Sequence, residues 1–296
     1  MLSTSIAMQQ LPLHPQGPTF SRIIAGAWRW KLSASSVERL IQTSLAEGIT
    51  TFDHADIYGD HSNEEIFGEV LRQQPALRDK MQLVTKCGIK FQSDKRPKTW
   101  VKHYDTSKEH IVWSADNSLR MLNTDRLDLL LIHRPDPLLN PHEVAEAFTK
   151  LKEQGKVLHF GVSNFTRSQF YMLQKFLPMP LVTNQIEISL ARVDPFFNGD
   201  LDLLMEHRAS AMAWSPLAGG KLMAGERELF SKASQYNATY TQLLLAWLLV
   251  HPSSIFPVIG TTQPERITEA AKALEVHLDK QDWFEMLQWA TGKEVA

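Results

Sequence analysis

The strongest constraint on the fold of this chain is an alternation that runs along nearly its whole length. Short apolar runs, rich in β-branched residues or leucine, are separated by longer segments with helical periodicity. This order is typical of parallel β-sheets built from βαβ units. Eight such runs occur, at 22–27, 49–53, 81–86, 127–133, 157–163, 181–185, 211–215 and 255–259.

The segments between these runs are amphipathic, and we expect them to cover the outer face of the sheet. They include 35–47, 108–122, 141–154, 240–250 and 263–275. Ser35 followed by Glu38 resembles a capping box at the start of the first helix, and Gly48 is placed to end it. Pro141 is placed at the first position of the helix predicted at 141–154.

Eight strand–helix units predict an α/β fold of the (β/α)8 TIM-barrel type, forming a single domain over residues 1–296. A doubly wound sheet is the alternative. The absence of any G-x-G-x-x-G turn disfavours it. Residues 10–20 hold three prolines and one glycine and predict a hairpin that closes the barrel bottom. Residues 280–289 predict one extra helix at the C-terminus.

Charge and cysteine content restrict the class of partner. The chain has 31 basic and 33 acidic residues, a formal net charge of −2, which gives no electrostatic footprint for nucleic acid or an anionic membrane. No targeting segment or membrane span is evident near the N-terminus or elsewhere. The single cysteine, Cys87, excludes an internal disulfide and a cysteine-based metal cluster. We therefore expect a cytoplasmic protein with a small-molecule partner, no metal and no obligate protein partner.

Polar residues stand at the ends of three otherwise apolar runs. Asp53, Lys86 and His133 end the second, third and fourth runs, and Tyr58 follows in the loop after Asp53. In a barrel these positions share the end where active sites are built. Each residue alone also has a plain structural interpretation, as a cap, a loop aromatic or a strand-end hydrogen bonder. Their common location favours a proton-transfer site.

The chemistry of such a site follows from the residue types. A phenol titrates near pH 10, and a nearby cation such as Lys86 is expected to favour the anion of Tyr58. Asp53 would hold the ammonium group in place. His133 would donate a hydrogen bond to a carbonyl oxygen. Protonating that oxygen completes a reduction only if hydride reaches the carbon, and a cofactor has to supply it.

Six motifs then resemble those of the aldo-keto reductase family, in order and spacing over nearly the whole chain. They are Gly48-Ile49-Thr50-Thr51-Phe52-Asp53-His54-Ala55-Asp56-Ile57-Tyr58-Gly59, Val84-Thr85-Lys86-Cys87-Gly88, Leu129-Leu130-Leu131-Ile132-His133-Arg134-Pro135, Gly161-Val162-Ser163-Asn164-Phe165, Asn184-Gln185 and Trp214-Ser215-Pro216-Leu217. The resemblance implies an NADPH-dependent oxidoreductase that reduces an aldehyde or ketone, with Tyr58 as general acid.

The same resemblance implies positions for the NADPH/NADP+ cofactor. Ser163, Asn164 and Gln185 would bind its carboxamide, and Trp214 would stack on the nicotinamide ring at a position that is more often tyrosine in the family. Glycines in the loop at 217–222 would let the backbone pass close to the pyrophosphate. Further cofactor positions in this region are Ser215, Leu217 and Lys221.

A second cofactor segment, at 257–266, ends one run and begins a helix, and so directs backbone N–H groups toward an anion. By resemblance, Arg266 and Thr261 would hold the 2′-phosphate of NADPH, and Glu269 would contact the adenine. Gly260 stands where many relatives have lysine, and Ala270 where many have asparagine. These departures leave the strength of the preference for NADPH over NADH open.

Two tryptophans are candidates for the substrate pocket. Trp28 follows the first run, and Trp100 lies in the lysine-rich, non-periodic stretch 88–106 after the third run. Both are equally compatible with simple packing roles.

Two other functions stay open at this point. Relatives of this fold accompany potassium channels as nicotinamide-binding regulatory subunits, and they retain the same four polar residues. A Schiff-base aldolase using Lys86 is the third possibility, which Asp53 disfavours because it would keep the lysine protonated. Neither the natural substrate nor the oligomeric state follows from the sequence.

Overall fold

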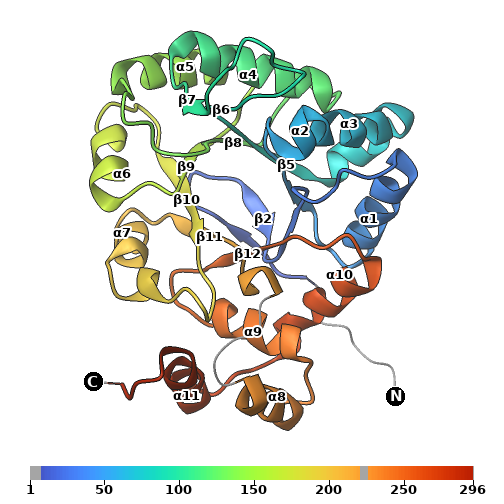
Figure 1. Ribbon diagram of the computed structural model, residues 1–296, viewed down its shortest axis with the longest axis vertical. Coiled ribbons are helices and arrows are strands. Elements are labelled where there is room, and N and C mark those ends of the chain that lie inside the picture. The colour runs from blue at the N-terminus through green and yellow to red at the C-terminus, as the bar shows by residue number, and fades with distance from the viewer. Residues whose placement is uncertain (1–7, 221–225, 296) are drawn as a thin grey trace.

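The computed structural model describes residues 8–220 and 226–295. Eight parallel strands form a closed barrel in the order β10, β11, β12, β3, β4, β5, β8, β9 (Figure 1). The (β/α)8 prediction is confirmed, and every predicted apolar run overlaps a barrel strand. The strands are β3 (Ile24–Gly26), β4 (Thr51–Asp53), β5 (Gln82–Cys87), β8 (Leu129–Ile132), β9 (Phe160–Ser163), β10 (Leu181–Glu187), β11 (Ser210–Trp214) and β12 (Phe256–Ile259).

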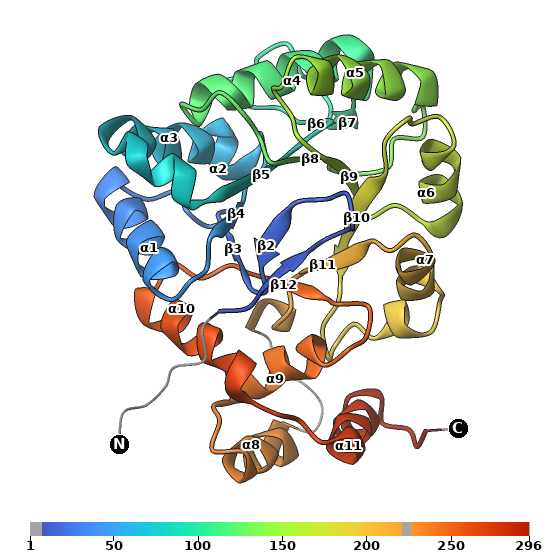
Figure 2. The same ribbon diagram turned by 180° about the vertical axis from the view of Figure 1, so that it is seen from behind.

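Helices surround the barrel on its outside (Figures 1 and 2). In the first helix the buried side chains Val37, Leu40 and Ile41 recur at helical spacing, so this helix turns one apolar stripe inward. The helices are α1 (Ala34–Ala46), α2 (Tyr58–His61), α3 (Asn63–Gln73), α4 (Lys108–Met121), α5 (Pro141–Glu153), α6 (Arg167–Gln174), α7 (Asp200–Glu206), α8 (Glu226–Gln235), α9 (Tyr240–Leu249), α10 (Pro264–Ala271) and α11 (Lys280–Thr291).

The N-terminus of α1 differs from the prediction. The cap is Ser33, whose side-chain oxygen accepts a hydrogen bond from the Ser36 N–H at 3.3 Å. Ser33 has the extended backbone that a cap requires, whereas Ser35 is already inside the helix, so the capping box at Ser35 was wrong. Gly48 adopts a left-handed φ of 74° just beyond the C-cap, which confirms that it ends the helix.

The barrel bottom is closed by the predicted N-terminal hairpin. Strands β1 (Gln10–Pro12) and β2 (Thr19–Ser21) pair antiparallel and lie across the barrel in the view of Figure 2. Leu13 and Phe20 are fully buried and pack with apolar side chains of the strands. The hairpin therefore seals one end of the barrel and leaves the other for the site. The strand residues in this cluster are Ile24, Val84, Leu129, Leu131, Val182, Met212, Phe256 and Val258.

The predicted C-terminal helix is α11, which packs against α9. The indole rings of Trp247 and Trp283 are stacked with centroids 4.7 Å apart. Each indole N–H donates to the backbone carbonyl of the other tryptophan, at 3.0 and 2.9 Å. Both indole N–H groups are thus satisfied by the same contact that fixes the helix.

The stretch 88–106 contains a small antiparallel ribbon of β6 (Ile89–Lys90) and β7 (His103–Tyr104). It follows β5 on the barrel face opposite the N-terminal hairpin (Figure 1). Nowhere in 8–220 or 226–295 is a helix long and apolar enough to cross a membrane.

Candidate active site

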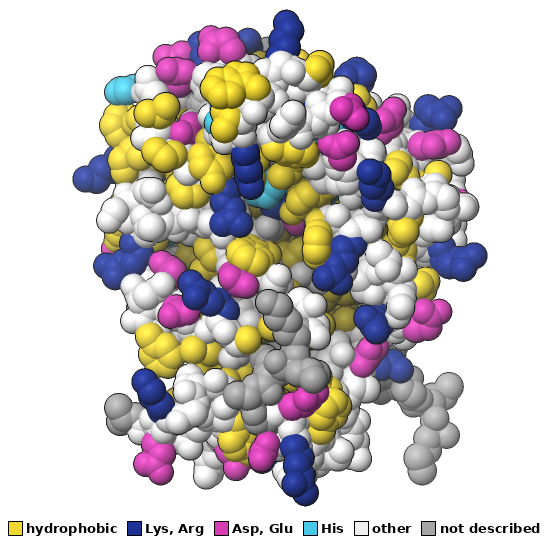
Figure 3. Space-filling view, viewed as in Figure 1, with side chains coloured by type: hydrophobic (Ala, Val, Ile, Leu, Met, Phe, Trp, Pro, Cys, Tyr) yellow, Lys and Arg dark blue, Asp and Glu magenta, His cyan; other side chains and the backbone are white. Residues whose placement is uncertain are grey.

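The predicted catalytic residues meet at one end of the barrel. Asp53 is the last residue of β4, Lys86 lies near the end of β5, and His133 directly follows β8. These strands are neighbours in the barrel. The face that carries α2 and the β6–β7 ribbon is hollowed near its centre, with hydrophobic side chains in the hollow and basic side chains around it (Figure 3). The site lies at the carboxyl ends of the strands, where barrel active sites are built.

Lys86 is the centre of the hydrogen-bond network. Its side chain is fully buried, and its Nζ donates to Asp53 Oδ2 at 2.7 Å, to the His54 carbonyl at 2.7 Å and to the Tyr58 hydroxyl at 3.2 Å. An ammonium group has three donors, and all three are used. Hydrogen bonds therefore connect Asp53 to Tyr58 through Lys86.

The environment of Lys86 keeps it charged. Burial alone would lower the pKa of Lys86, but the Asp53 carboxylate and the Tyr58 hydroxyl outweigh it, and the net shift is upward. A protonated amine has no lone pair with which to attack a carbonyl. The Schiff-base alternative thus lacks its nucleophile in this arrangement.

Tyr58 behaves differently from the expectation based on the sequence. Burial raises the pKa of its phenol, and the opposing effect of Lys86 is too small to reverse the shift. Asp53 adds to the rise because its negative charge offsets the ammonium group. Lys86 thus acts in the expected direction, but the expectation that it favours the anion of Tyr58 was wrong for the net shift of this pKa. At neutral pH the phenol therefore carries its proton, as a proton donor must.

His133 completes the group from the neighbouring strand. Its ring lies edge-on to the Tyr58 ring, with centroids 5.9 Å apart. Burial and the nearby Lys86 hold the pKa of His133 well below its usual value, so the imidazole is neutral. Its Nδ1 is buried and has no hydrogen-bond partner in the described part of the chain. A neutral ring of this kind can donate or accept one hydrogen bond at each nitrogen.

A tight turn places the Tyr58 side chain. Gly59, Asp60 and His61 all have φ near +60°, a conformation that is strained for the two non-glycine residues. A Cβ at position 59 would lie 1.8 Å from Asn63 Oδ1, so only glycine fits there. The Asn63 side chain in turn donates to the Ala27 carbonyl at 2.8 Å and ties this turn to the end of β3. The sequence motif thus specifies a backbone, with Tyr58 directed toward Lys86.

Four of the predicted nicotinamide residues lie together beside this group. Ser163 Oγ donates to the Gln185 carbonyl at 2.8 Å, and Asn164 Nδ2 donates to Ser163 Oγ at 2.8 Å. The Trp214 indole donates to Asn164 Oδ1 at 2.9 Å, which fixes the edge of its ring. Because Asn164 has a left-handed φ of 60°, its amide lies where all these contacts are possible.

Two contacts at the site were not expected from the sequence. Gln185 Nε2 donates to Asp53 Oδ1 at 2.9 Å, so each oxygen of this carboxylate has its own donor. The Arg134 guanidinium lies over the Trp214 ring, 5.7 Å from its centroid. The position of Arg134 beside His133 was the only signal for it in the sequence. Together these contacts join the predicted catalytic residues and the predicted nicotinamide residues into one site.

The remaining predicted cofactor positions lie around the same face. Ser215 has a left-handed φ of 51°, and Leu217 directly precedes a 3-10 turn (Ala218–Gly220). Lys221 lies outside the described residues. Thr261 accepts a hydrogen bond from Trp30 through its carbonyl at 2.8 Å. Arg266 is exposed, and Glu269 is half-buried with its backbone carbonyl bonded to Gln242.

The two candidate substrate tryptophans have different surroundings. Trp28 is 52% exposed and packs on the end of β12, where a Cβ at Gly260 would lie 2.5 Å from its Nε1. The glycine at 260 therefore makes room for this indole. Trp100 is 83% exposed. In residues 8–220 and 226–295, no cluster of histidine, cysteine and carboxylate side chains could hold a metal.

Comparisons with known proteins agree with this geometry. The family model described as "Aldo/keto reductase family" matches residues 22–289. A 6-dehydroglucose reductase of Agrobacterium fabrum is 48% identical over 285 residues, covering 93% of this chain and 96% of that protein. A thermostable aldo-keto reductase solved with the inhibitor epalrestat has a TM-score of 0.84 at 25% identity, covering 95% of this chain and 100% of the other. An aldo/keto reductase of Klebsiella pneumoniae, solved with NADP and acetate, has a TM-score of 0.79 at 24% identity, with 97% and 98% covered.

Proposed function

Because the chain belongs to the aldo/keto reductase family, we propose that it reduces an aldehyde or ketone to an alcohol with NADPH, with Tyr58 as the general acid. The observation that carries this proposal is the buried line of contacts from Asp53 through Lys86 to Tyr58 at the barrel mouth. A protonated phenol beside a fixed ammonium group can give up its proton and have the resulting charge stabilised.

In the proposed reaction, the substrate oxygen lies against the Tyr58 hydroxyl and the His133 ring. Tyr58 transfers its proton to that oxygen as negative charge develops there. Lys86, 3.2 Å from the phenol oxygen, stabilises the phenolate, and Asp53 keeps the ammonium group directed at it. The neutral His133 ring donates a hydrogen bond that positions the carbonyl. If Nε2 is the donor, the buried Nδ1 is the acceptor of the neutral ring, and it has no partner among the described residues.

The residues at the mouth also fit a nicotinamide cofactor, which would supply the hydride when bound. Ser163, Asn164 and Gln185 offer amide and hydroxyl groups at the ends of adjacent strands, and the Trp214 ring is held by its edge with a face available for stacking. The Klebsiella structure solved with NADP has the same fold, which supports the choice of cofactor.

Two features favour NADPH over NADH. Helix α10 begins without a side-chain cap. Its first residue, Pro264, has no N–H, and the Arg266 N–H donates to the Gln263 carbonyl at 3.1 Å, which leaves the Glu265 N–H for an anion. Arg266 lies in its first turn, exposed and without an ion pair to any described residue. In this proposal Arg266 and Thr261 hold the 2′-phosphate, and Glu269 contacts the adenine. The Trp28 indole occupies the space where a side chain at position 260 would lie, so position 260 adds no group to the phosphate site.

A polyhydroxylated aldehyde is the first substrate to test. The relative from Agrobacterium fabrum, 48% identical, is named for the reduction of 6-dehydroglucose. Identity at this level over 93% of the chain makes a sugar-derived aldehyde a better starting point than a simple aliphatic one.

The experiment measures the oxidation of NADPH and of NADH with 6-dehydroglucose, simple aldehydes and diketones. We expect turnover with NADPH on at least one aldehyde, and weaker turnover with NADH. Quenching of tryptophan emission by NADPH, compared between the native chain and Trp214→Leu, reports cofactor binding separately. Tight NADPH retention without turnover on the whole panel would contradict the reductase proposal and favour a nicotinamide-binding regulatory subunit.

A further inference from the structure

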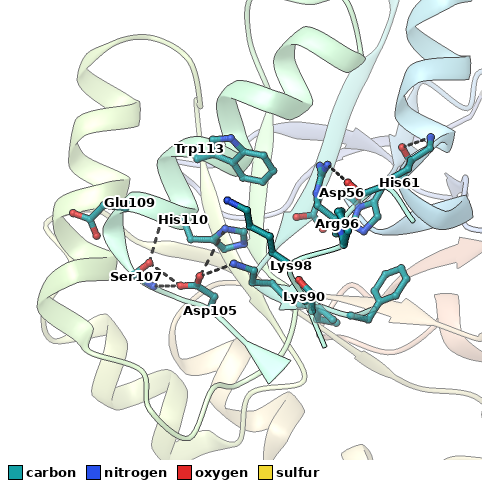
Figure 4. A pocket seen from close by; sticks show the side chains of 15 residues that line it. Asp56, His61, Lys90, Arg96, Lys98, Asp105, Ser107, Glu109, His110 and Trp113 are labelled. Carbon is teal, nitrogen blue, oxygen red and sulfur yellow. Dashed lines mark hydrogen bonds and ion pairs between the residues drawn. The ribbon is translucent and has the colours of Figure 1, made fainter. Parts of the chain in front are cut away.

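A cavity of about 610 Å³ lies between the 88–106 stretch, α2 and the N-terminal half of α4 (Figure 4). None of the four proposed catalytic residues lines it. Asp56, which does, accepts a hydrogen bond from Ser114 of α4 at 2.9 Å, whereas Tyr58 contacts Lys86 inside the barrel. The two side chains therefore leave the same segment on opposite sides. The cavity is outside the barrel mouth and is large enough for a small organic ligand.

The walls of this cavity are flat and largely apolar. The His61 and Phe91 rings are stacked with centroids 5.0 Å apart, and the His110 and Trp113 rings are stacked at 5.6 Å. Ile89 and Pro97 also line it. Such a lining fits a planar ring, because an aromatic ligand can stack or pack edge-on against these side chains.

Cationic side chains outnumber ionised carboxylates around the cavity. The basic residues are Lys90, Lys95, Arg96 and Lys98, and the carboxyl groups are those of Asp56, Asp105 and Glu109. Lys90 is paired with Asp105 at 3.1 Å and Lys95 lies 3.9 Å from Glu65, whereas neither Arg96 nor Lys98 has an ion pair to any described residue. Burial raises the pKa of Asp56 to about 8, so this carboxyl group is mostly neutral at pH 7. The remaining positive charge favours an anionic ligand.

Three buried polar atoms in the cavity lining lack hydrogen-bond partners in the described chain: Asp56 Oδ1, His61 Nε2 and His110 Nε2. Asp56 and His110 are only 8% and 9% exposed. His61 Nδ1 lies 2.7 Å from the Asp56 carbonyl, so it must be the donor, and Nε2 is the acceptor in the neutral ring. A protonated Asp56 can donate. One group that both donates and accepts, such as a hydroxyl, would satisfy such atoms.

We propose that this cavity is a second binding site, for a small hydroxylated aromatic carboxylate. The ring packs between the aromatic walls, and the carboxylate meets Arg96 and Lys98. The unpartnered atoms of Asp56 and His61 have almost no exposed surface, so these two side chains rotate slightly to meet the hydroxyl. Because His61 ends the turn that places Tyr58, the ligand contacts the same backbone segment as the proposed active site without entering it.

A crystal of the full chain soaked with 3-bromo-4-hydroxybenzoate tests the location. We expect an anomalous bromine peak among Phe91, Arg96 and Trp113. A bromine peak only at the barrel mouth, beside Tyr58 and His133, would overturn the proposal, because the compound would then be bound as a substrate analogue. Water alone in a fully soaked cavity would overturn it too.

Calorimetric titration with matched compounds tests the chemistry. We expect 4-hydroxybenzoate to bind at least about tenfold more tightly than benzoate, which lacks the hydroxyl, and than 4-hydroxybenzamide, which lacks the charge. The double variant Arg96→Met/Lys98→Met should weaken the binding of 4-hydroxybenzoate by the same factor. Lys102→Met, an exposed lysine of the same stretch that does not line the cavity, should leave it unchanged. Equal binding of the three compounds, or equal loss in both variants, would contradict the proposed recognition.

Discussion

Removing Lys86 should expose how strongly its charge supports the buried site. The Lys86 side chain is 0% exposed and that of Asp53 is 3% exposed, with 2.7 Å between Nζ and Oδ2. In Lys86→Met the Asp53 carboxylate keeps the hydrogen bond from Gln185 Nε2 at 2.9 Å but loses its counter-ion. Breaking a buried ion pair from one side costs about 3–5 kcal/mol of unfolding free energy. With a urea m-value of about 3 kcal/mol/M, the unfolding midpoint should fall by roughly 1 to 1.7 M.

The double variant Asp53→Asn/Lys86→Met separates charge from packing. It removes the uncompensated carboxylate, so it should regain most of the stability that Lys86→Met loses. Lowering the pH should also reduce the difference in unfolding free energy between Lys86→Met and the native chain, because protonation of Asp53 removes the same buried charge. Urea unfolding followed by circular dichroism measures all three proteins. Equal destabilisation of the single and double variants at neutral pH would refute the charge argument and leave only lost packing.

Three further predictions follow from individual contacts. Arg266→Met should weaken NADPH binding by about 10- to 100-fold, because one charge-assisted interaction is lost, and it should leave NADH binding unchanged. Fluorescence titration measures both affinities. Equal losses for the two cofactors would mean that Arg266 does not contact the 2′-phosphate. Gly260→Ala puts a Cβ 2.5 Å from Trp28 Nε1, so it should shift tryptophan emission and lower kcat/KM by roughly tenfold, and an unchanged rate would mean that Trp28 is remote from the substrate. Burial raises the pKa of Asp56 to about 8, so the native chain should lose stability as pH rises from the acid range through this value. In urea unfolding, Asp56→Asn should show a flatter dependence of stability on pH. Parallel pH profiles of the two proteins would contradict the pKa shift.

The barrel itself was predictable because its signals are repeated and local. Eight apolar runs, each too short for a helix and each followed by an amphipathic segment, leave few alternatives. The N-terminal hairpin and the C-terminal helix α11 were also predictable, from proline spacing and periodicity respectively. The cap of α1 was not, because Ser33 and Ser35 are both good caps and only the backbone conformation decides between them.

The residues of the site could be predicted, but the direction of their pKa shifts and some of their contacts could not. The strand ends located Asp53, Lys86 and His133, since parallel strands deliver their carboxyl ends to one face. The direction of the Tyr58 pKa depends on how far burial outweighs Lys86, and burial is a property of the folded chain. The same is true of the bond from Gln185 to Asp53, which joins residues 132 positions apart.

The cavity beside α2 had no signal in the sequence for a related reason. Its lining comes from three separate elements, and its polar atoms are notable only because they lack partners after folding. Lysines at 90, 95 and 98 were visible as a basic stretch, but which of them pairs with a carboxylate depends on where Asp105 and Glu65 lie.

The most direct test of the proposed mechanism is the rate of carbonyl reduction by Tyr58→Phe with saturating NADPH. The variant keeps the ring and removes only the hydroxyl that contacts Lys86. We expect kcat to fall by about 100- to 10,000-fold, the usual contribution of a general acid, while NADPH binding stays within twofold of the native value. Full activity in Tyr58→Phe, with NADPH still bound, would contradict the assignment of Tyr58 as the proton donor.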